Sequence, residues 1–172
     1  NFDAVLQNYG VERTDGIVIE GDSQHYAQMP YYLVPTVNST DAISDFASKG
    51  YYVLMPYAQG IKKTDSVRDT VTINSLLTSS DSAYSKVDVN SGTIDKTDDD
   101  IDGPFDLGVS ITETLDDDKE TQIVYYTSSN LMESQINQMV SGGNEQMIMS
   151  SLNWMCSSDE TSTISVPSKN LQ

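Results

Sequence analysis

The chain has 172 residues, of which 37% are hydrophobic, so its length and composition fit one domain with its own core. It carries 9 Lys and Arg against 26 Asp and Glu, and its formal net charge is -17. Such a surface repels phosphate backbones and anionic lipid headgroups, which argues against nucleic acid as a partner and favours a cation or a basic partner.

The first half of the chain alternates predicted helices with predicted strands. Apolar residues at helical spacing predict a helix over 2–9. A second helix is expected between 38 and 50, where short polar residues that can cap a helix precede apolar ones. Apolar runs predict strands over 16–20 and 51–56, with an irregular loop over 21–35 after the first. Short strands that alternate with helices are typical of a parallel α/β sheet.

The second half of the chain is predicted to contain a β-hairpin. Apolar residues alternate over 104–114, and a strong apolar run follows over 120–127. The acidic turn 116–118 separates these two strands, so they should pair antiparallel. A further strand is expected over 71–79, and the polar stretch 81–102 is expected to be an exposed excursion.

The last predicted helix begins near Asn144, whose short side chain is expected to cap it. Apolar residues occupy several sides of this helix, namely Met147, Ile148, Met149, Leu152, Trp154, Met155 and Cys156. We therefore expect the helix to be buried on most of its circumference, with Trp154 in the core. A short edge strand is expected over 163–166, because Pro167 cannot donate to a ladder.

Two residues are candidates for nucleophilic or acid–base chemistry, and the sequence supports neither. His25 is the single histidine, and it lies in a polar loop without a Gly-x-Ser-x-Gly turn. Cys156 lies late in an apolar helix, away from any activating charge, and is expected to be a small buried hydrophobic residue. Most carboxylates lie in polar turns, where water keeps them ionised, which disfavours a glycosidase-like pair. We therefore expect no catalytic, cofactor-binding or metal-binding residues and no enzyme activity.

Three other patterns permit a binding role but fit a structural role better. The run Asp98–Asp102 before Gly103 resembles part of a calcium loop, but the later Glu of an EF-hand is missing, so a solvated turn is expected and calcium binding stays open. We interpret Gly142–Asn144 as a flexible helix entry rather than an anion site. Adjacent tyrosines occur at 31–32, 51–52 and 125–126. Packing within sheets is favoured for them, with carbohydrate or peptide stacking as the alternative.

Several stretches of the chain match, in order, the passages of one known family. The residues Asn1–Val11 followed by Asp15–Val18 resemble its leading helix, its Tyr-Gly-Ile and its Asp-Gly-Val-Val passage. Leu76–Ser80 is similar to its Leu-Leu-x-Thr-Ser segment, and Gly103–Phe105 to its Gly-Pro-Tyr/Phe entry. Gly143–Met155 is similar to its Gly-Asn-x-x-Leu-Phe-x-Asn-x-x-Asn-Trp-Leu helix. The family is that of the gliding-motility-type ABC transporter auxiliary proteins, and the similarity spans nearly the whole chain.

The resemblance implies a three-layer, flavodoxin-like α/β domain related to class I glutamine amidotransferases, without their cysteine nucleophile. The sheet would be mainly parallel with one antiparallel hairpin, and residues 1–172 would be a single extracytoplasmic domain, the later part of a larger one. The domain would lie at the extracytoplasmic face of a membrane, anchored through segments outside 1–172, beside ABC permease and ATPase subunits. One departure is Thr127–Leu131, where the family has Gly-Asp-Ser-Asp-Phe, which puts a cation or polar-ligand role of that turn in doubt here.

These observations lead to three readings of function. The first, which we expect, is a non-enzymatic binding or scaffolding domain of an ABC transporter auxiliary membrane protein. The alternatives are a hydrolase-like enzyme of amidotransferase-like ancestry and an extracellular adhesin-type domain. The settings of His25 and Cys156 argue against the enzyme. The in-order family similarity favours the first reading over the adhesin.

Overall fold

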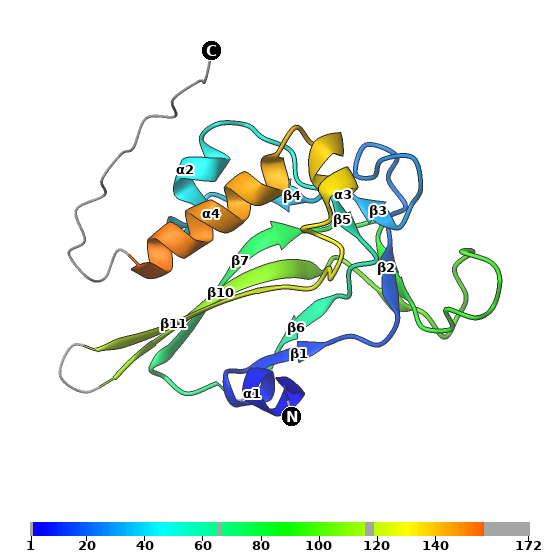
Figure 1. The fold of residues 1–172 in the computed structure, drawn as a ribbon. Coiled ribbons are helices and arrows are strands. Elements are labelled where there is room, and N and C mark those ends of the chain that lie inside the picture. The colour runs from blue at the N-terminus through cyan, green and yellow to red at the C-terminus, as the bar shows by residue number, and fades with distance from the viewer. Residues whose placement is uncertain (1, 65–66, 116–118, 157–172) are drawn as a thin grey trace, which may run out of the picture.

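The strands of this chain pair antiparallel throughout the residues that the structure, a computed structural model, describes: 2–64, 67–115 and 119–156 (Figure 1). The largest sheet contains β1 (Val11–Arg13), β4 (Thr36–Val37), β6 (Ile61–Lys63), β7 (Val71–Thr78), β10 (Asp106–Thr114) and β11 (Glu120–Tyr126). A second sheet contains β2 (Ile17–Ile19), β8 (Tyr84–Lys86) and β9 (Ile101–Asp102). A two-stranded sheet joins β3 (Tyr32–Leu33) to β5 (Met55–Pro56).

The helices of the described residues cover the largest sheet unequally. Four of these are α-helices, namely α1 (Phe2–Asn8), α2 (Ser44–Ala47), α3 (Ser134–Met139) and α4 (Gly143–Cys156), and a 3-10 turn spans Asp41–Ile43. Figure 1 places α2 and α4 on one side of this sheet and α1 on the other. Among the described residues, no helix has both the length and the apolar character that a bilayer crossing requires.

The prediction of a three-layer, flavodoxin-like domain with a mainly parallel sheet is wrong. Neighbouring parallel strands need a long crossover, usually a helix, between them. Here the two predicted strands at 16–20 and 51–56 lie in different small sheets, where β2 pairs with β8 and β5 pairs with β3, both antiparallel. The helix-strand alternation of the first half therefore does not build βαβ units.

The predicted hairpin is confirmed by the pairing of β10 with β11. Val109 lies opposite Tyr125 and Ile111 opposite Ile123, in a continuous antiparallel register. β10 is the central strand, because it also pairs with β7 and, at Asp106, with β6. The acidic turn 116–118 and the predicted strand 163–166 lie outside the described residues.

Two hydrophobic clusters fill the two sides of the largest sheet. The first lies on the α4 side and includes Leu77, Leu107 and Met147, all fully buried. The second is smaller and lies on the α1 side, around Leu6 and Ile111. Each fully buried side chain of this size contributes about 1.5–3 kcal/mol to folding. The α4 side therefore holds most of the core.

Helix α4 is buried along one narrow stripe rather than around most of its circumference. Its buried residues are Gly143, Asn144, Met147 and Ser151. Met149 and Leu152 are exposed, and Trp154 is only partly buried against the edge of the first cluster, so its predicted place inside the core is wrong. Small residues in the stripe let the helix backbone approach the segment beneath it, and its larger side chains are left outside.

Candidate functional site

The Gly-Asn pair at the start of α4 docks this helix on the segment before β5. The Asn144 side chain is fully buried, and its Oδ1 accepts a hydrogen bond from the Leu54 N–H at 2.9 Å. Its Nδ2 donates to the carbonyl oxygens of Leu54 at 2.9 Å and Leu131 at 2.8 Å. A Cβ at Gly143 would lie 2.1 Å from the Tyr52 carbonyl oxygen. Asn144 therefore does not act as the predicted helix cap, and the pair is a backbone clamp.

The other segments that resemble the transporter auxiliary family also make contacts that hold parts of the backbone together. Ser79 exchanges two bonds with Phe105: its N–H donates to the Phe105 carbonyl, and its Oγ accepts from the Phe105 N–H, both at 2.9 Å. The N–H and Oγ of Ser80 donate to the buried Glu20 carboxylate at 3.1 and 2.5 Å. At Gly16, a Cβ would lie 2.1 Å from the Lys86 carbonyl oxygen. These motif residues are accounted for by contacts that join strands and loops.

His25 and Cys156 are not brought together. His25 is half-buried in the loop before β3, and its Nδ1 is buried without a hydrogen-bond partner among the described residues. Cys156 ends α4 and is exposed, so the prediction that it is buried is wrong. In Figure 1 the end of α4 and strand β3 lie on opposite sides of the molecule. The geometry of these two residues offers no nucleophile–base pair.

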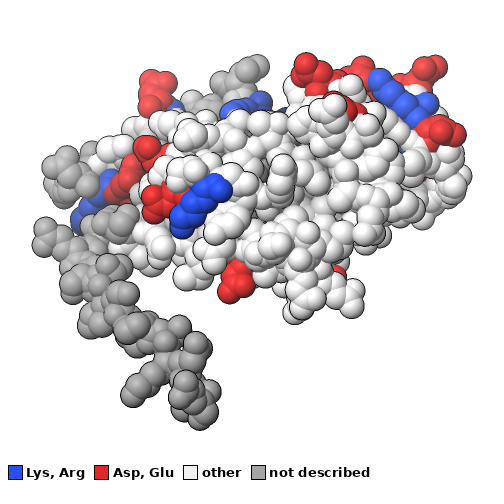
Figure 2. Space-filling view, turned by 90° about the horizontal axis from the view of Figure 1, so that it is seen from above, with Lys and Arg blue, Asp and Glu red and all other residues white. Residues whose placement is uncertain are grey.

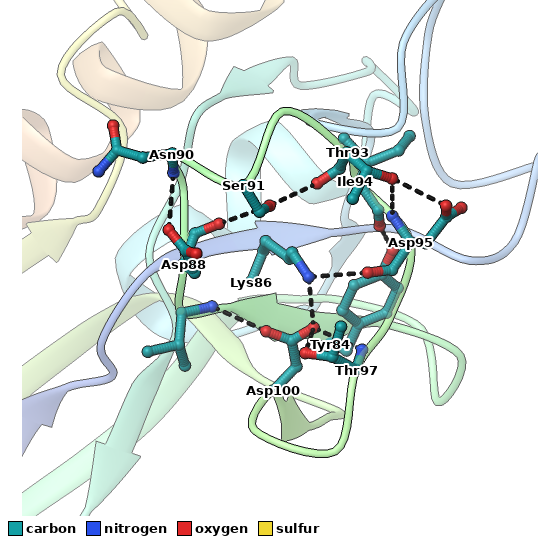
Figure 3. Close-up of polar contacts among 11 residues, drawn as sticks. Tyr84, Lys86, Asp88, Asn90, Ser91, Thr93, Ile94, Asp95, Thr97 and Asp100 are labelled. Atoms are coloured by element: carbon teal, nitrogen blue, oxygen red, sulfur yellow. Dashed lines mark hydrogen bonds and ion pairs between the residues drawn. The ribbon is translucent and has the colours of Figure 1, made fainter.

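The acidic loop before β9 is organised around a buried ion pair (Figure 3). Lys86 Nζ lies 3.0 Å from Asp100 Oδ2, and the two side chains are 3% and 1% exposed. Asp100 also accepts hydrogen bonds from the N–H groups of Val87 and Thr97 and from the Thr97 hydroxyl. Burial alone raises the pKa of Asp100, but these bonds and the one from Lys86 outweigh it and hold that pKa well below its ordinary value.

This pair corrects two predictions about the stretch 81–102. The stretch is not simply an exposed excursion, because it contributes β8 and β9 and buries Ser85 and Lys86. Nor is Asp98–Asp102 a fully solvated turn, since the Asp100 carboxylate is committed to Lys86 and to backbone donors. Within the described ranges, no three His, Cys, Asp or Glu residues are placed to hold a metal ion.

A second surface of the molecule carries little charge. The segments 24–61 and 121–156 contain five charged residues between them, although the whole chain has 35, counting its 9 basic and 26 acidic residues. The five are Asp41, Asp45, Lys49, Glu133 and Glu145. Figure 2 views the molecule from above, and most of the middle of this side is free of charged side chains.

Tyrosine and methionine side chains fill this surface. They come from the loops around β3 and β5 and from the segment that contains α3, which gather on one side of Figure 1. We call the following set the Tyr–Met face: Met29, Tyr31, Tyr32, Tyr51, Tyr52, Tyr57, Met132 and Met139. Tyr52 is 71% exposed and Met132 53%, which is unusual for side chains of this size.

Part of the Tyr–Met face is a groove and part is a packed aromatic cluster. The groove has a volume of about 400 Å³ and is lined by Ala27, Val34, Gly50, Tyr51, Tyr52, Met139, Val140 and Ser141. In the cluster, the rings of Tyr31 and Tyr57 stack with centroids 5.1 Å apart, and Tyr32 meets both edge-on. Burial, together with Tyr32 and Tyr31, raises the pKa of Tyr57.

Backbone strain is concentrated on the same surface. Among the described residues, the non-glycine positions with positive φ are Gln28 at 65°, Tyr57 at 53° and Ser141 at 53°. They lie in the three segments that form the Tyr–Met face. Such conformations cost on the order of 1–3 kcal/mol each and gather at functional sites, where the surrounding structure holds them in place. The coincidence of strain, exposed aromatic rings and low charge makes this face the candidate site.

The sequence reading of the tyrosine pairs is partly confirmed. Tyr126 lies in β11, and its hydroxyl is 2.7 Å from that of Ser151 on α4, while burial raises its pKa to about 12. That pair packs within a sheet as predicted. The pairs at 31–32 and 51–52 instead contribute to the exposed face. The charge gap in 24–61 is the signal that could have indicated this surface from the sequence.

Comparisons with known proteins bear on the fold alone. No protein-family model matches the chain, and no curated protein matches it. The architecture is similar to a solved structure described as the mmIFT52 N-terminal domain, with a TM-score of 0.57 and 12% sequence identity. The match covers 95% of this chain and 60% of that one, so the chain spans about 60% of the length of that structure. At this identity the likeness is one of fold and does not extend to partners or activity.

Proposed function

We propose that this chain is a non-enzymatic binding and scaffolding domain of an ABC transporter auxiliary membrane protein, acting at the extracytoplasmic face. Its binding surface would be the Tyr–Met face. The observation that carries the binding role is a tyrosine- and methionine-rich surface with little charge on a chain of net charge -17. The transport setting is supported by the family-like segments, and the partners would be permease or ATPase subunits of that complex.

The composition of the face suits a protein partner. Tyrosine and methionine are enriched at protein interfaces, whereas lysine, glutamate and aspartate are depleted. Tyrosine offers a large apolar ring at a low cost in conformational entropy, and methionine adapts its shape to irregular surfaces. Because few charges have to lose water here, association costs less free energy than it would elsewhere on this acidic molecule.

The family-like Gly-Asn pair supports this assignment by its position. Asn144 bonds to Leu54 and Leu131, which belong to the two segments that carry Tyr52, Tyr57 and Met132. Ser128 adds a further link, because its Oγ donates to the Pro56 carbonyl at 2.5 Å. The motif that most resembles the transporter family thus fixes the platform of the Tyr–Met face.

Site-specific photo-cross-linking in the native cell tests the proposal. A cross-linking residue replaces Tyr52 in the full-length protein, and a matched variant carries it at Val89, which is also exposed but lies in the acidic loop. We expect position 52 to form a cross-link to a permease subunit of the transporter and position 89 to form none. Equal products from both positions, or no transporter subunit among the products from position 52, would contradict the proposal.

A further inference from the structure

The groove of the Tyr–Met face also indicates the chemistry of what binds in it. Resting on the proposed function, we infer that the groove accepts a protein segment with an apolar anchor side chain between basic flanking residues. Three features of the groove support this inference: its lining, the charges around it and the backbone contacts of its walls.

The lining of the groove selects an apolar anchor. Ala27, Val34, Val140 and Met139 contribute aliphatic surface, and Tyr52 contributes an exposed ring. None of the lining residues is Asp, Glu, Lys or Arg. A charged group entering the groove would lose water without gaining an ionic partner. Its volume of about 400 Å³ falls within the range of pockets that enclose small ligands, so it can hold a large apolar side chain.

The charges around the groove select basic flanks. Glu133 directly precedes α3 and lies close enough to Tyr57 to affect its pKa, while Glu145 follows α3 in the first turn of α4 and contacts Asn137. Segments 24–61 and 121–156 carry four carboxylates, Asp41, Asp45, Glu133 and Glu145, against one cation, Lys49. Lys49 directly precedes the groove-lining residues Gly50 and Tyr51, and it lies with Asp45 along a neighbouring hollow that also includes Tyr51. The net charge of the two segments is therefore negative, and it adds to that of the whole acidic chain.

The same charges disfavour a second copy of the chain as the occupant, because two molecules of net charge -17 repel each other at long range. A partner with Lys or Arg next to its apolar anchor would gain from this potential in both its association rate and its affinity.

The backbone of the groove walls is held by contacts within the chain. The Tyr52 carbonyl lies against Gly143 and next to the segment that Asn144 holds, and the opposite wall ends in the left-handed turn of Ser141 and Gly142 at φ 53° and 85°. A site that is already ordered loses little conformational entropy on binding, which raises affinity. An exposed groove held open in this way is suited to a segment that inserts a side chain.

Defined peptides test this chemistry. The probe is a fluorescein-labelled peptide with two leucines between pairs of lysines, compared with one that has glutamate in place of lysine and one that has serine in place of leucine. Fluorescence anisotropy with the intact chain measures affinity. We expect the lysine–leucine peptide to bind at least about tenfold more tightly than either control, and its affinity to fall as added salt screens the rim.

Surface variants locate the binding. Tyr52→Ser and Met139→Ser change exposed side chains of the groove, and Val89→Ser is the matched exposed control outside it. We expect each groove variant to weaken the lysine–leucine peptide about tenfold or more and the control to leave it unchanged. Equal binding of the glutamate peptide, unaltered binding to the Tyr52→Ser variant, or failure of every peptide to bind would overturn the inference.

The two experiments separate this inference from the proposed function. If position 52 cross-links to a transporter subunit but the lysine–leucine peptide does not bind, the function stands and the chemistry of the partner segment is wrong. If the peptide binds in the groove but no transporter subunit is cross-linked, the chemistry stands and the transport role is wrong.

Discussion

The loop over 87–100 and the Tyr–Met face are both built largely from irregular backbone, but they differ in how their side chains are partnered. In the loop, carboxylates and hydroxyls bond to groups within the loop and to β8, and Asp100 is buried against Lys86 (Figure 3). On the Tyr–Met face, large apolar side chains remain exposed and the backbone is strained at Gln28, Tyr57 and Ser141. Many polar groups of the loop are thus paired within the chain, whereas the Tyr–Met face leaves apolar surface that a partner can cover.

This contrast changes which feature of the sequence points to function. The acidic run is conspicuous in the sequence, but its central carboxylate serves the fold. The Tyr–Met face is marked by the scarcity of charge in a chain where Asp and Glu are otherwise frequent. In a strongly charged protein, a segment that avoids charge is therefore more informative than a cluster of the prevailing charge.

The largest expected effect is on the loop, through Asp100→Ala. This change leaves the buried Lys86 ammonium with the Asp95 carbonyl oxygen but without its anionic partner, and breaking one side of a buried ion pair costs about 3–5 kcal/mol. Urea denaturation measures the free energy of unfolding, and Asp99→Ala in the same loop is the exposed control, expected to change it by less than about 0.5 kcal/mol. Equal effects of the two changes would contradict the conclusion that the loop depends on the buried Lys86–Asp100 pair.

The same carboxylate predicts the direction of a pH dependence. Because the folded protein holds the pKa of Asp100 below its unfolded value of about 4, its contribution to stability is complete above that pH and is lost as the pH falls below it. Comparing unfolding free energies of the parent chain and Asp100→Asn between pH 7 and pH 3 isolates this contribution. The difference between them should shrink towards pH 3, and a difference that grows on acidification would contradict the assignment.

A somewhat smaller effect is expected at the platform of the face, from Asn144→Ala. The change leaves the N–H and carbonyl of Leu54 and the carbonyl of Leu131 without the Asn144 amide, at a cost of about 2–4 kcal/mol. Asn153→Ala, at an exposed position of the same helix, is the control. If the face depends on this clamp, Asn144→Ala should also increase amide hydrogen exchange in 50–57. Exchange that stays unchanged there would mean that the clamp does not hold the face.

The smallest effect concerns the strain itself. Gln28 is exposed with φ 65°, so Gln28→Gly relieves a conformation that glycine adopts readily and should stabilise the chain by about 0.5 kcal/mol. Gln24→Gly, at an exposed position of the same loop without positive φ, should instead destabilise it by about 0.5–1 kcal/mol. Thermal unfolding measures the stability of the two variants. Changes of the same sign would contradict the claim that the backbone at Gln28 is strained.

The sequence was informative where side-chain pattern alone decides the structure. The alternation over 104–114 and the apolar run over 120–127 predicted β10 and β11, and apolar spacing predicted α1 and β2. The strand expected over 71–79 corresponds to β7, which pairs with β10. Strands β1 and β6 of the same sheet were not predicted, because they have three residues each. Two of the three residues in each are charged, so neither carries a hydrophobic pattern. The strands of the sheet were therefore predicted to run mainly parallel, whereas they pair antiparallel.

Helix α4 illustrates a different limit. Its apolar residues on several sides predicted general burial, whereas its buried stripe consists of Gly143, Asn144, Met147 and Ser151. Close approach to the Tyr52–Leu54 backbone needs small side chains and one amide, which a hydrophobicity pattern does not detect. The candidate face was missed for a related reason: its residues come from three separate segments, and tyrosine pairs by themselves do not distinguish a sheet from an interface.

Methionine oxidation provides the most direct test of whether the Tyr–Met face is the binding surface. Met29 and Met149 are equally exposed at 47%, with Met139 at 42% and Met132 at 53%, but Met149 lies on α4 outside the face. Mild peroxide treatment of the protein in its native membranes and of the isolated chain, followed by mass spectrometry, compares their rates of sulfoxide formation. We predict that Met29, Met132 and Met139 are oxidised more slowly in the membranes while Met149 is unchanged. Equal protection of Met149, or no protection of the three, would contradict the account.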